Sequence, residues 1–207
     1  MKQKLENPKA KILEAALIEF SQHSYETAST NNISKLAKLS KGTVFNYYEN
    51  KENLFKQVLE YSISVFKKEL NTFKFKSSEP QKIIKEAIEF IYNFYKEHQN
   101  IYNFYLRSIY DMSIPFRTEL LKVVRLFSTL LTYRLIHNFK KLSILTPKYS
   151  EESLLYILNS VISRLIDSYF IENESPIDKE SLFDEICSIV SDILIIDNSK
   201  NIDNNKN

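Results

Sequence analysis

The stretch that decides the fold is residues 31–51, which read NNISKLAKLSKGTVFNYYENK. Just before it, Ser29 occupies the position of a helix N-cap, and a short apolar face follows for one helix: Ile33, Leu36 and Ala37. Leu39 then fills a turn, and Ser40 caps a second short helix. Two short helices joined by a tight turn are the pattern of a helix-turn-helix, whose second helix exposes one face to the major groove of DNA.

Longer amphipathic helices flank this motif. Pro8 begins a helix that ends near His23 and carries one apolar stripe: Ile12, Leu13, Ala16, Leu17 and Phe20. Asn50 is placed to cap another helix, from Lys51 to about Phe73, whose predicted buried positions are Leu54, Phe55, Val58, Leu59, Ile63, Phe66 and Leu70. We therefore expect a three-helix DNA-binding domain in residues 1–50 and a connecting helix with its linker in residues 51–76.

The remainder of the chain is helical in pattern, with breaks near Pro115, Pro147 and Pro176. The predicted helices cover residues 81–97, 100–111, 116–141, 151–172 and 179–196. The 207 residues include one glycine and five prolines, too few positive-φ positions for a sheet-rich fold, so the predicted class is all-α. Residues 77–197 are expected to form a helical bundle, and residues 198–207 a disordered tail.

Composition argues against several classes of protein. Loops that cradle nucleotide phosphates need several glycines, and a single cysteine, Cys187, allows neither an internal disulfide nor a cysteine zinc site. His23, His98 and His137 lack metal-ligand spacing, and no catalytic constellation stands out. We expect no catalytic residue, no metal, no cofactor and no enzymatic activity. With no apolar stretch of membrane-spanning length, we also expect a cytoplasmic protein with no membrane partner.

Charge is divided unevenly along the chain. Residues 1–76 hold 13 lysines against 8 acidic residues, a net charge of +5, and residues 77–207 hold 15 basic against 18 acidic residues, net −3. The N-terminal part is therefore the candidate for a polyanionic partner.

Residues 8–56, about a quarter of the chain, resemble the TetR family of bacterial regulators. The family's helix-turn-helix typically ends in S-x-G-T-[LV]-[YF]-x-[YH]-[YF]-x-[NS]-K-[ED]-x-L, and residues 40–54 fit this pattern. Other matching positions are Ile12 to Ala16, Tyr25, Ser29, Ile33 and Ala37. Two positions depart from the family, which often has glycine where this chain has Ser24 and Lys38; a positive φ at either site would carry strain.

The resemblance implies two groups of DNA contacts. The family pattern gives phosphate contacts to hydroxyls, helix-start amides and one lysine: Ser29, Thr30, Thr43, Tyr47 and Lys51. Four residues on the second helix of the motif are the candidates for facing base edges: Lys41, Gly42, Phe45 and Asn46. Lysine suits guanine acceptors, asparagine suits adenine, and an aromatic ring can touch a thymine methyl group.

The resemblance also implies that residues 77–197 are a ligand-binding and dimerisation domain, with a ligand cavity in the middle helices and dimerisation through the last two. Residues 90–116 are rich in aromatic side chains, and an apolar or amphipathic ligand is expected to contact Phe90, Phe94, Tyr102, Tyr105, Arg107 and Phe116. Residues 151–172 and 179–196 carry apolar stripes wide enough for a homodimer interface, in which we expect Ile162 and Leu165 to take part.

The sequence thus predicts a regulator, in this family usually a repressor, that binds palindromic double-stranded operator DNA as a dimer. A small, lipophilic effector is expected to release it. The alternative is a protein of the same fold whose DNA binding is architectural and whose regulator is a protein partner.

Overall fold

The computed structural model describes residues 7–170 and 179–195, and in these ranges the protein is all-α, as predicted. Its helices are α1 (Pro8–Gln22), α2 (Thr30–Ala37), α3 (Lys41–Tyr48), α4 (Lys51–Thr72), α5 (Pro80–Glu97), α6 (Gln99–Tyr110), α7 (Arg117–Lys141), α8 (Glu151–Phe170) and α9 (Lys179–Leu194). The predicted tail, residues 198–207, lies outside the described residues. No helix in the described ranges is long and apolar enough to cross a membrane.

The chain forms two compact units, and both α5 and α7 run through the boundary between them. Unit 1 comprises residues 1–72 and 94–127, and unit 2 comprises residues 73–93 and 128–207. Residues 94–127, predicted as part of the second domain, fall in unit 1 because α6 packs on α1. These units are groupings by contact, so the domain boundaries given above stay a prediction.

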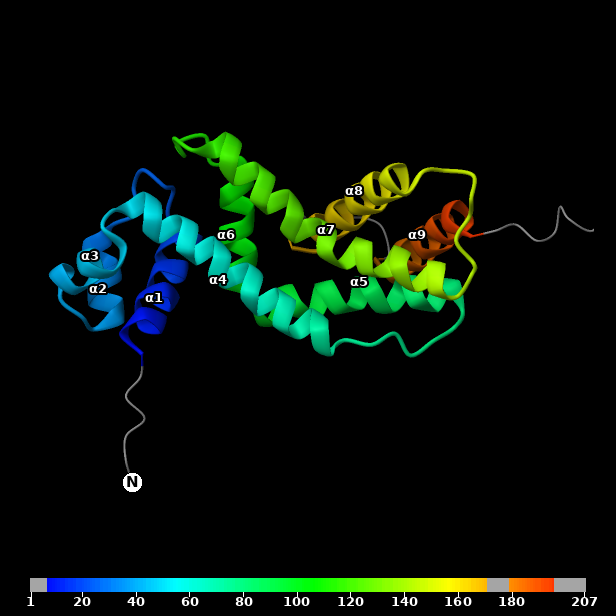
Figure 1. Cartoon of the computed structure of the whole chain (residues 1–207), viewed down its shortest axis with the longest axis horizontal. Helices are drawn as coiled ribbons and strands as arrows, with labels where there is room; N and C mark the ends of the chain where they lie inside the picture. The colour runs from blue at the N-terminus through cyan, green and yellow to red at the C-terminus, as the bar shows by residue number, and fades with distance from the viewer. Residues whose placement is uncertain (1–6, 171–178, 196–207) are drawn as a thin grey trace, which may run out of the picture. The chain divides into compact units, whose positions relative to one another are not determined.

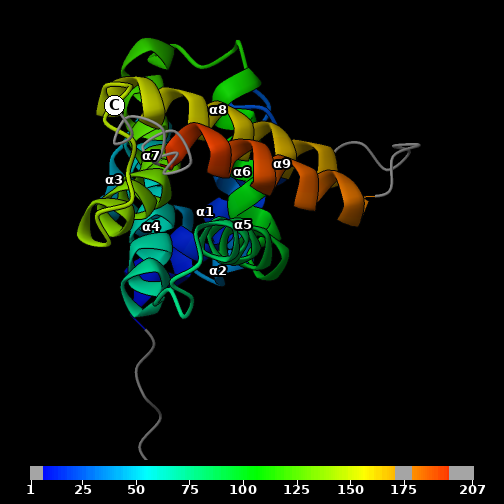
Figure 2. The same ribbon diagram turned by 90° about the vertical axis from the view of Figure 1, so that its right-hand side faces the viewer.

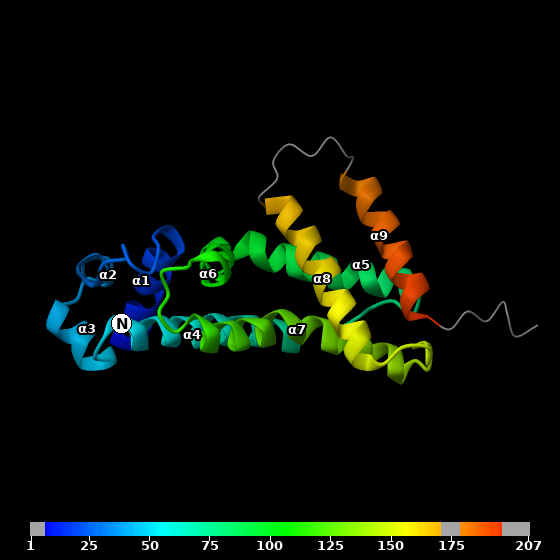
Figure 3. The same cartoon turned by 90° about the horizontal axis from the view of Figure 1, so that it is seen from above.

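Unit 1 is built around α1, which contacts α2, α4 and α6. Figure 1 shows α1, α2 and α3 gathered beside the first turns of α4, and Figure 3 shows α6 lying next to α1. The predicted stripe of α1 is buried throughout, as are the seven predicted positions of α4. Transfer of these apolar side chains from water is the main force that holds the unit together.

The helix ends of unit 1 follow the predicted capping residues. Pro8 occupies the first turn of α1, and the side chain of Asn7 accepts a hydrogen bond from the amide of Lys9. Asn50 accepts one from the amide of Asn53 at the start of α4, at 2.8 Å. The local sequence therefore determines where these helices begin.

Aromatic rings from five segments fill the centre of unit 1. The Phe55 ring of α4 packs on Phe20 of α1, Phe104 of α6 and Phe116, at centroid distances of 4.9, 4.8 and 5.7 Å. Tyr25, in the turn after α1, completes the cluster through edge contacts with Phe55 and Phe116. These pairs fix the turn that precedes α2 against the rest of the unit.

Unit 2 buries apolar side chains from α5, α7, α8 and α9. Figure 2 shows α8 and α9 running side by side. The buried residues include Ile83, Ile84, Ala87, Leu135, Phe139, Leu154, Leu158, Ile162, Phe183, Cys187, Val190 and Leu194. Across α5 and α9, Lys85 forms an ion pair with Asp184 at 2.8 Å.

Two expectations about individual residues need correction. Leu36, predicted to lie on the apolar face of α2, is 49% exposed, because it lies about 100° around the helix from the centre of the buried face. Ser34 takes the inward position instead and donates its hydroxyl to the carbonyl of Asn31. Ser24 and Lys38 occupy the two positions where the resembled family often has glycine. Lys38 has a φ of 56°, in the left-handed region, whereas Ser24 has a negative φ.

Candidate nucleic-acid interface

Helix α3 has one anchored face and one open face. Val44 and Tyr48 are buried at 2% and 4% exposure, and the Tyr48 hydroxyl donates to the carbonyl of Lys9 in α1. Burial raises the pKa of Tyr48 to about 12, with a smaller contribution from Tyr47, so the phenol stays protonated. The exposed side of the helix carries all the residues predicted to face bases, Lys41, Gly42, Phe45 and Asn46, and also Tyr47.

The start of α3 is held by a hydroxyl pair. Ser40 Oγ accepts a hydrogen bond from the amide of Thr43, and the two hydroxyls lie 2.8 Å apart. Thr43 is half-buried and Tyr47 is 48% exposed, one helical turn further along α3. The two residues predicted to contact phosphates thus lie on the same side of α3.

Helix α2 begins on a buried carboxylate that sequence reasoning missed. Glu19 of α1 is 3% exposed, and its Oε1 accepts a hydrogen bond from the amide of Ser29 at 2.7 Å. Ser29 Oγ in turn accepts from the amide of Asn32, which confirms Ser29 as the N-cap. The only sequence signal was an acidic residue between apolar stripe positions, which by itself does not show what it meets.

The turn between α2 and α3 closes on backbone hydrogen bonds. The left-handed conformation of Lys38 directs its amide to the carbonyl of Lys35 and brings the amide of Leu39 to the carbonyl of Ser34, both at about 3 Å. Leu39 is half-buried in this turn, and the side chain of Lys38 is exposed beside α3.

Lys51 has partners within the chain. Its Nζ donates to the carbonyls of Glu26 and Ala28, at 3.1 and 3.2 Å, and lies 4.8 Å from the centre of the Tyr25 ring. These carbonyls belong to the turn that leads into the N-cap of α2. Lys51 therefore orders the segment that carries Ser29 and Thr30, and a phosphate contact would use the remaining donor of its ammonium group.

The same turn is held from the other side by the end of α6. Asp111 accepts a hydrogen bond from the amide of Tyr25, and Ser113 Oγ accepts one from the amide of Glu26. Burial alone raises the pKa of Asp111, but hydrogen bonds from Ser113 and Tyr25 and the charge of Arg107 outweigh it, so the pKa lies below its ordinary value.

Arg107, predicted as a ligand contact, binds the end of α1. Its Nε donates to the carbonyl of Ser21 and its Nη2 to the carbonyl of Gln22, both at 2.9 Å. These are carbonyls of the last turn of α1, which have no acceptor role within the helix, so the guanidinium acts as a C-terminal cap.

The aromatic residues predicted to contact a ligand fall into three places. Phe94, Tyr102 and Tyr105 surround the ring of Tyr95 in unit 1, at centroid distances of 5.5, 4.8 and 6.1 Å. Phe116 belongs to the cluster of Phe55, and Phe90 packs on Phe73 in unit 2 at 4.6 Å. The structure thus brings three of the six predicted residues together.

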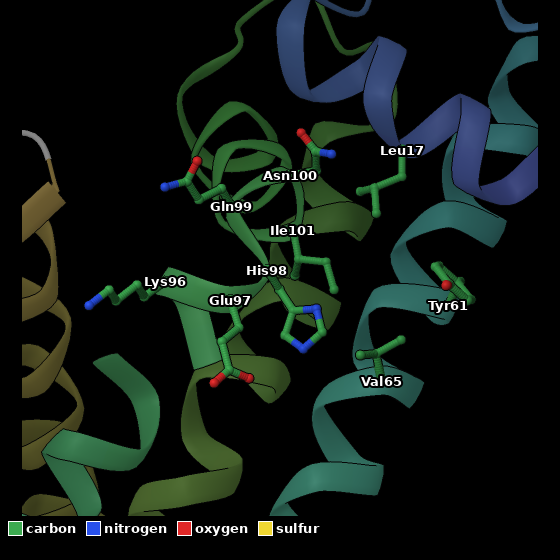
Figure 4. A pocket seen from close by; sticks show the side chains of 9 residues that line it. All are labelled: Leu17, Tyr61, Val65, Lys96, Glu97, His98, Gln99, Asn100 and Ile101. Atoms are coloured by element: carbon green, nitrogen blue, oxygen red, sulfur yellow. The ribbon is translucent and has the colours of Figure 1, made fainter. Parts of the chain in front are cut away.

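A cavity of about 540 Å³ lies in unit 1 between α1, α4 and the junction of α5 with α6 (Figure 4). It is lined by Leu17, Tyr61, Val65, Lys96, Glu97, His98, Gln99, Asn100 and Ile101, and none of the six predicted ligand residues is among them. The close-up shows the side chains of Glu97 and His98 on the same side of this junction.

Large apolar side chains are exposed on each of the two helices predicted to dimerise. Tyr156 and Ile157 of α8 and Ile189 of α9 are exposed, at 77%, 37% and 51%. Ile162, predicted to take part in the dimer interface, is 6% exposed within its own chain, and the side chain of Leu165 lies outside the described residues.

An all-α protein with a capped, two-helix motif and an exposed second helix belongs to the helix-turn-helix class of DNA-binding proteins. Residues 12–58 match the model of the bacterial regulatory proteins of the tetR family. Over 96 residues the chain is 28% identical to the transcriptional repressor NicS of Pseudomonas putida, a match that covers 46% of this chain and 45% of NicS. Over 171 residues it is 24% identical to YhgD, an uncharacterized transcriptional regulator of Bacillus subtilis, covering 83% of this chain and 88% of YhgD.

The fold is also found in solved structures. The transcriptional regulator FadR of Bacillus subtilis, in complex with stearoyl-CoA, has a TM-score of 0.68 at 13% identity, over 89% of this chain and 98% of FadR. The match of residues 12–58 to the family model, these relatives and this shared fold together support a TetR-family transcriptional regulator.

Proposed function

We propose that this TetR-family regulator is a repressor that binds palindromic operator DNA as a homodimer and leaves it when a small, lipophilic ligand binds. The observation that carries the proposal is the open face of α3, where Lys41, Gly42, Phe45 and Asn46 are exposed while Val44 and Tyr48 anchor the helix. A rigid helix with one free polar face is what reading base edges in the major groove requires.

In the proposed complex, residues around this face contact phosphates and set the position of α3. Ser29 and Thr30 present the N-terminus of α2, and Thr43 and Tyr47 present hydroxyls from α3. Lys51 adds positive charge and, by holding the turn before α2, positions the first two residues. These contacts supply affinity, and the four residues of the open face supply sequence preference.

Dimerisation is proposed through α8 and α9, whose exposed apolar side chains a second copy of the chain would cover. A twofold dimer presents two copies of α3 to two half-sites, which is why the operator is expected to be palindromic.

The effector is proposed to be lipophilic because the middle helices are rich in aromatic residues, three of which surround Tyr95. The shared fold with FadR, whose structure contains stearoyl-CoA, supports an acyl ligand. Within unit 1, α6 and the residues that follow it are hydrogen-bonded to the DNA-binding helices: Arg107 binds the end of α1, and Asp111 and Ser113 bind the turn before α2. A ligand that moves α6 would therefore also move these helices.

Fluorescence anisotropy with duplexes from the DNA upstream of the gene tests this function. Wild-type protein is expected to prefer one upstream duplex over scrambled DNA, with affinity that falls steeply as salt is raised, because neutralised phosphates release counterions. Asn46→Ala should change preference at one base pair per half-site by about 1–3 kcal/mol. Asn103→Ala, at an exposed asparagine of α6, is the matched control.

The ligand is tested on the same complex by adding acyl-CoAs, fatty acids and planar apolar compounds, with coenzyme A alone as the polar control. Release of the duplex by lipophilic compounds, weakened in Tyr105→Ala, is the expected result. Equal affinity for upstream and scrambled duplexes with a flat salt response would contradict the DNA-binding role, and release by polar metabolites alone would contradict the lipophilic effector.

A further inference from the structure

Three metal-ligating side chains meet beside the cavity of unit 1. Glu69 comes from the last turn of α4, Glu97 is the last residue of α5, and His98 lies between α5 and α6. One ligand atom from each of the three lies within 4.8 Å of the others, and His98 Nε2 is 2.6 Å from Glu69 Oε1. Residues far apart in the sequence thus converge on one point.

We propose that Glu69, Glu97 and His98 bind one divalent transition-metal ion of the zinc or cobalt kind. One imidazole nitrogen with two carboxylate oxygens is a donor set that these ions accept, and the nitrogen donor disfavours calcium and magnesium. The two carboxylates neutralise the charge of the ion. The proposal does not depend on the proposed function, because it concerns binding measured without DNA.

The imidazole of His98 is held in place by its neighbours. Its ring lies 4.7 Å from the ring of Phe94, which is itself buried against Phe66 of α4 at 4.9 Å. This contact fixes the ring on the side of Glu69 and limits the conformational entropy lost when an ion binds.

The spacing of the three groups suits an ion after a small adjustment. Zinc is bound by nitrogen and oxygen at about 2.0–2.2 Å, which places neighbouring ligand atoms of a tetrahedral site about 3.3–3.6 Å apart. Bringing the present atoms to that spacing opens the His98–Glu69 pair by less than about 1 Å and draws Glu97 inward. Glu97 is exposed, so its side chain is free to make this movement.

Three protein ligands leave the coordination of the ion incomplete. Both Glu97 and His98 line the cavity of about 540 Å³, which has room for a water molecule or a ligand atom in the open position (Figure 4). In the same view Lys96 extends away from Glu97, so its ammonium group does not compete for the site. The ion would link the end of α4 to the junction of α5 and α6 within unit 1.

Substitution of Glu97 distinguishes metal binding from a purely structural role of Glu69 and His98. A hydrogen bond between His98 and Glu69 joins α4 to the α5–α6 junction without any ion, and that bond does not involve Glu97. Glu97→Gln therefore keeps the hydrogen bond and removes one proposed ligand.

The experiment uses the full chain without a histidine tag, stripped with a chelator and titrated with Co²⁺ by visible absorption and with Zn²⁺ by calorimetry. One ion per chain is expected, with a raised melting temperature in excess Zn²⁺. His98→Gln and Glu97→Gln should each weaken binding at least about tenfold. His137→Gln, at an exposed histidine of α7 in unit 2, should bind as the wild type does.

A lack of saturable binding would overturn the proposal, and so would equal affinity in the wild type and in Glu97→Gln. A cobalt–thiolate band would overturn it as well, because it would place the ion at Cys187, whose pKa burial raises to about 11, with Asp184 adding to the effect. Since Glu97 is exposed, its substitution leaves the fold intact, and the test stands even if His98→Gln unfolds.

Discussion

At the scale of the residue, Lys51 shows how one side chain can have a role that its position in a motif does not reveal. The family pattern gives this lysine to a phosphate, and in the structure its ammonium group donates to two carbonyls of the turn before α2. Both roles serve the same end, because the turn positions the N-cap of α2.

Lys51→Ala is expected to lower the free energy of unfolding by about 1–2 kcal/mol, because two carbonyls lose a charged donor that is only half-buried. Urea denaturation in the absence of DNA measures this loss. Lys35→Ala, at an exposed lysine of α2, is the control and should change stability little. Unchanged stability in Lys51→Ala would mean that the side chain is free for phosphate contacts alone.

Asp111 gives stability a dependence on pH. Its pKa in the folded chain lies below the ordinary value of 3.8, so its contribution is fully present above that value and is lost as the pH falls through the lowered pKa. Between pH 6 and pH 3, the free energy of unfolding should therefore fall more in the wild type than in Asp111→Asn. Denaturation curves at several pH values test this, and an identical pH dependence in both proteins would contradict it.

At the scale of the element, α2 ends by a geometry that its sequence does not favour. Lys38 has a φ of 56° and a ψ of 41°, a conformation that glycine adopts freely and that costs other residues about 1–2 kcal/mol. The family that the motif resembles often has glycine at this position. This chain retains the turn through backbone hydrogen bonds and the buried Ile33 and Ala37.

Lys38→Gly is expected to stabilise the protein by up to about 1 kcal/mol, since relief of the left-handed backbone exceeds the added entropy of the unfolded chain. The comparison is Lys35→Gly, inside the same helix, which should destabilise by about 1 kcal/mol. The urea midpoint is expected to rise in Lys38→Gly and to fall in Lys35→Gly. A loss of stability in both variants would contradict the inference that the backbone at Lys38 is strained. Weaker DNA binding by Lys38→Gly would indicate that the lysine also reaches a phosphate.

At the scale of the whole molecule, dimerisation depends on which apolar residues the fold leaves uncovered. The sequence stripe of α8 included Ile162, which the chain buries internally, whereas Ile157 and Ile189 stay exposed. A charge at Ile162 is therefore expected to unfold unit 2, so loss of dimers in that variant would say nothing about an interface.

Ile189→Glu is expected to yield folded monomers that no longer bind operator DNA, because a charge in an apolar interface has no partner. Light scattering gives the mass, and circular dichroism verifies the helix content. Val123→Glu, at an exposed apolar residue of α7 in unit 1, should remain dimeric. If Ile189→Glu stays dimeric at micromolar concentration, the interface lies elsewhere.

The sequence by itself determined the helices and the motif. Both depend on local signals, because a helix start and a buried face are set by residues within a few turns. The signals are the N-cap residues Ser29, Ser40 and Asn50 and the apolar periodicity of α1 and α4. Part of the exposed face of α3 was predictable for the same reason, since helical geometry places Asn46 opposite the buried Val44 and Tyr48.

Only the tertiary structure decided what the helices place together. Three contacts join residues that are far apart in the sequence, and no local period encodes them. They are Glu19 with Ser29, Arg107 with Ser21 and Glu69 with His98, at separations of 10, 86 and 29 residues. The exposure of Leu36 and the burial of Ile162 likewise depend on which neighbouring helix covers each face. The hydrophobic effect has no direction, so the sequence specifies which residues prefer burial, and packing determines which of them are buried and which polar groups they enclose.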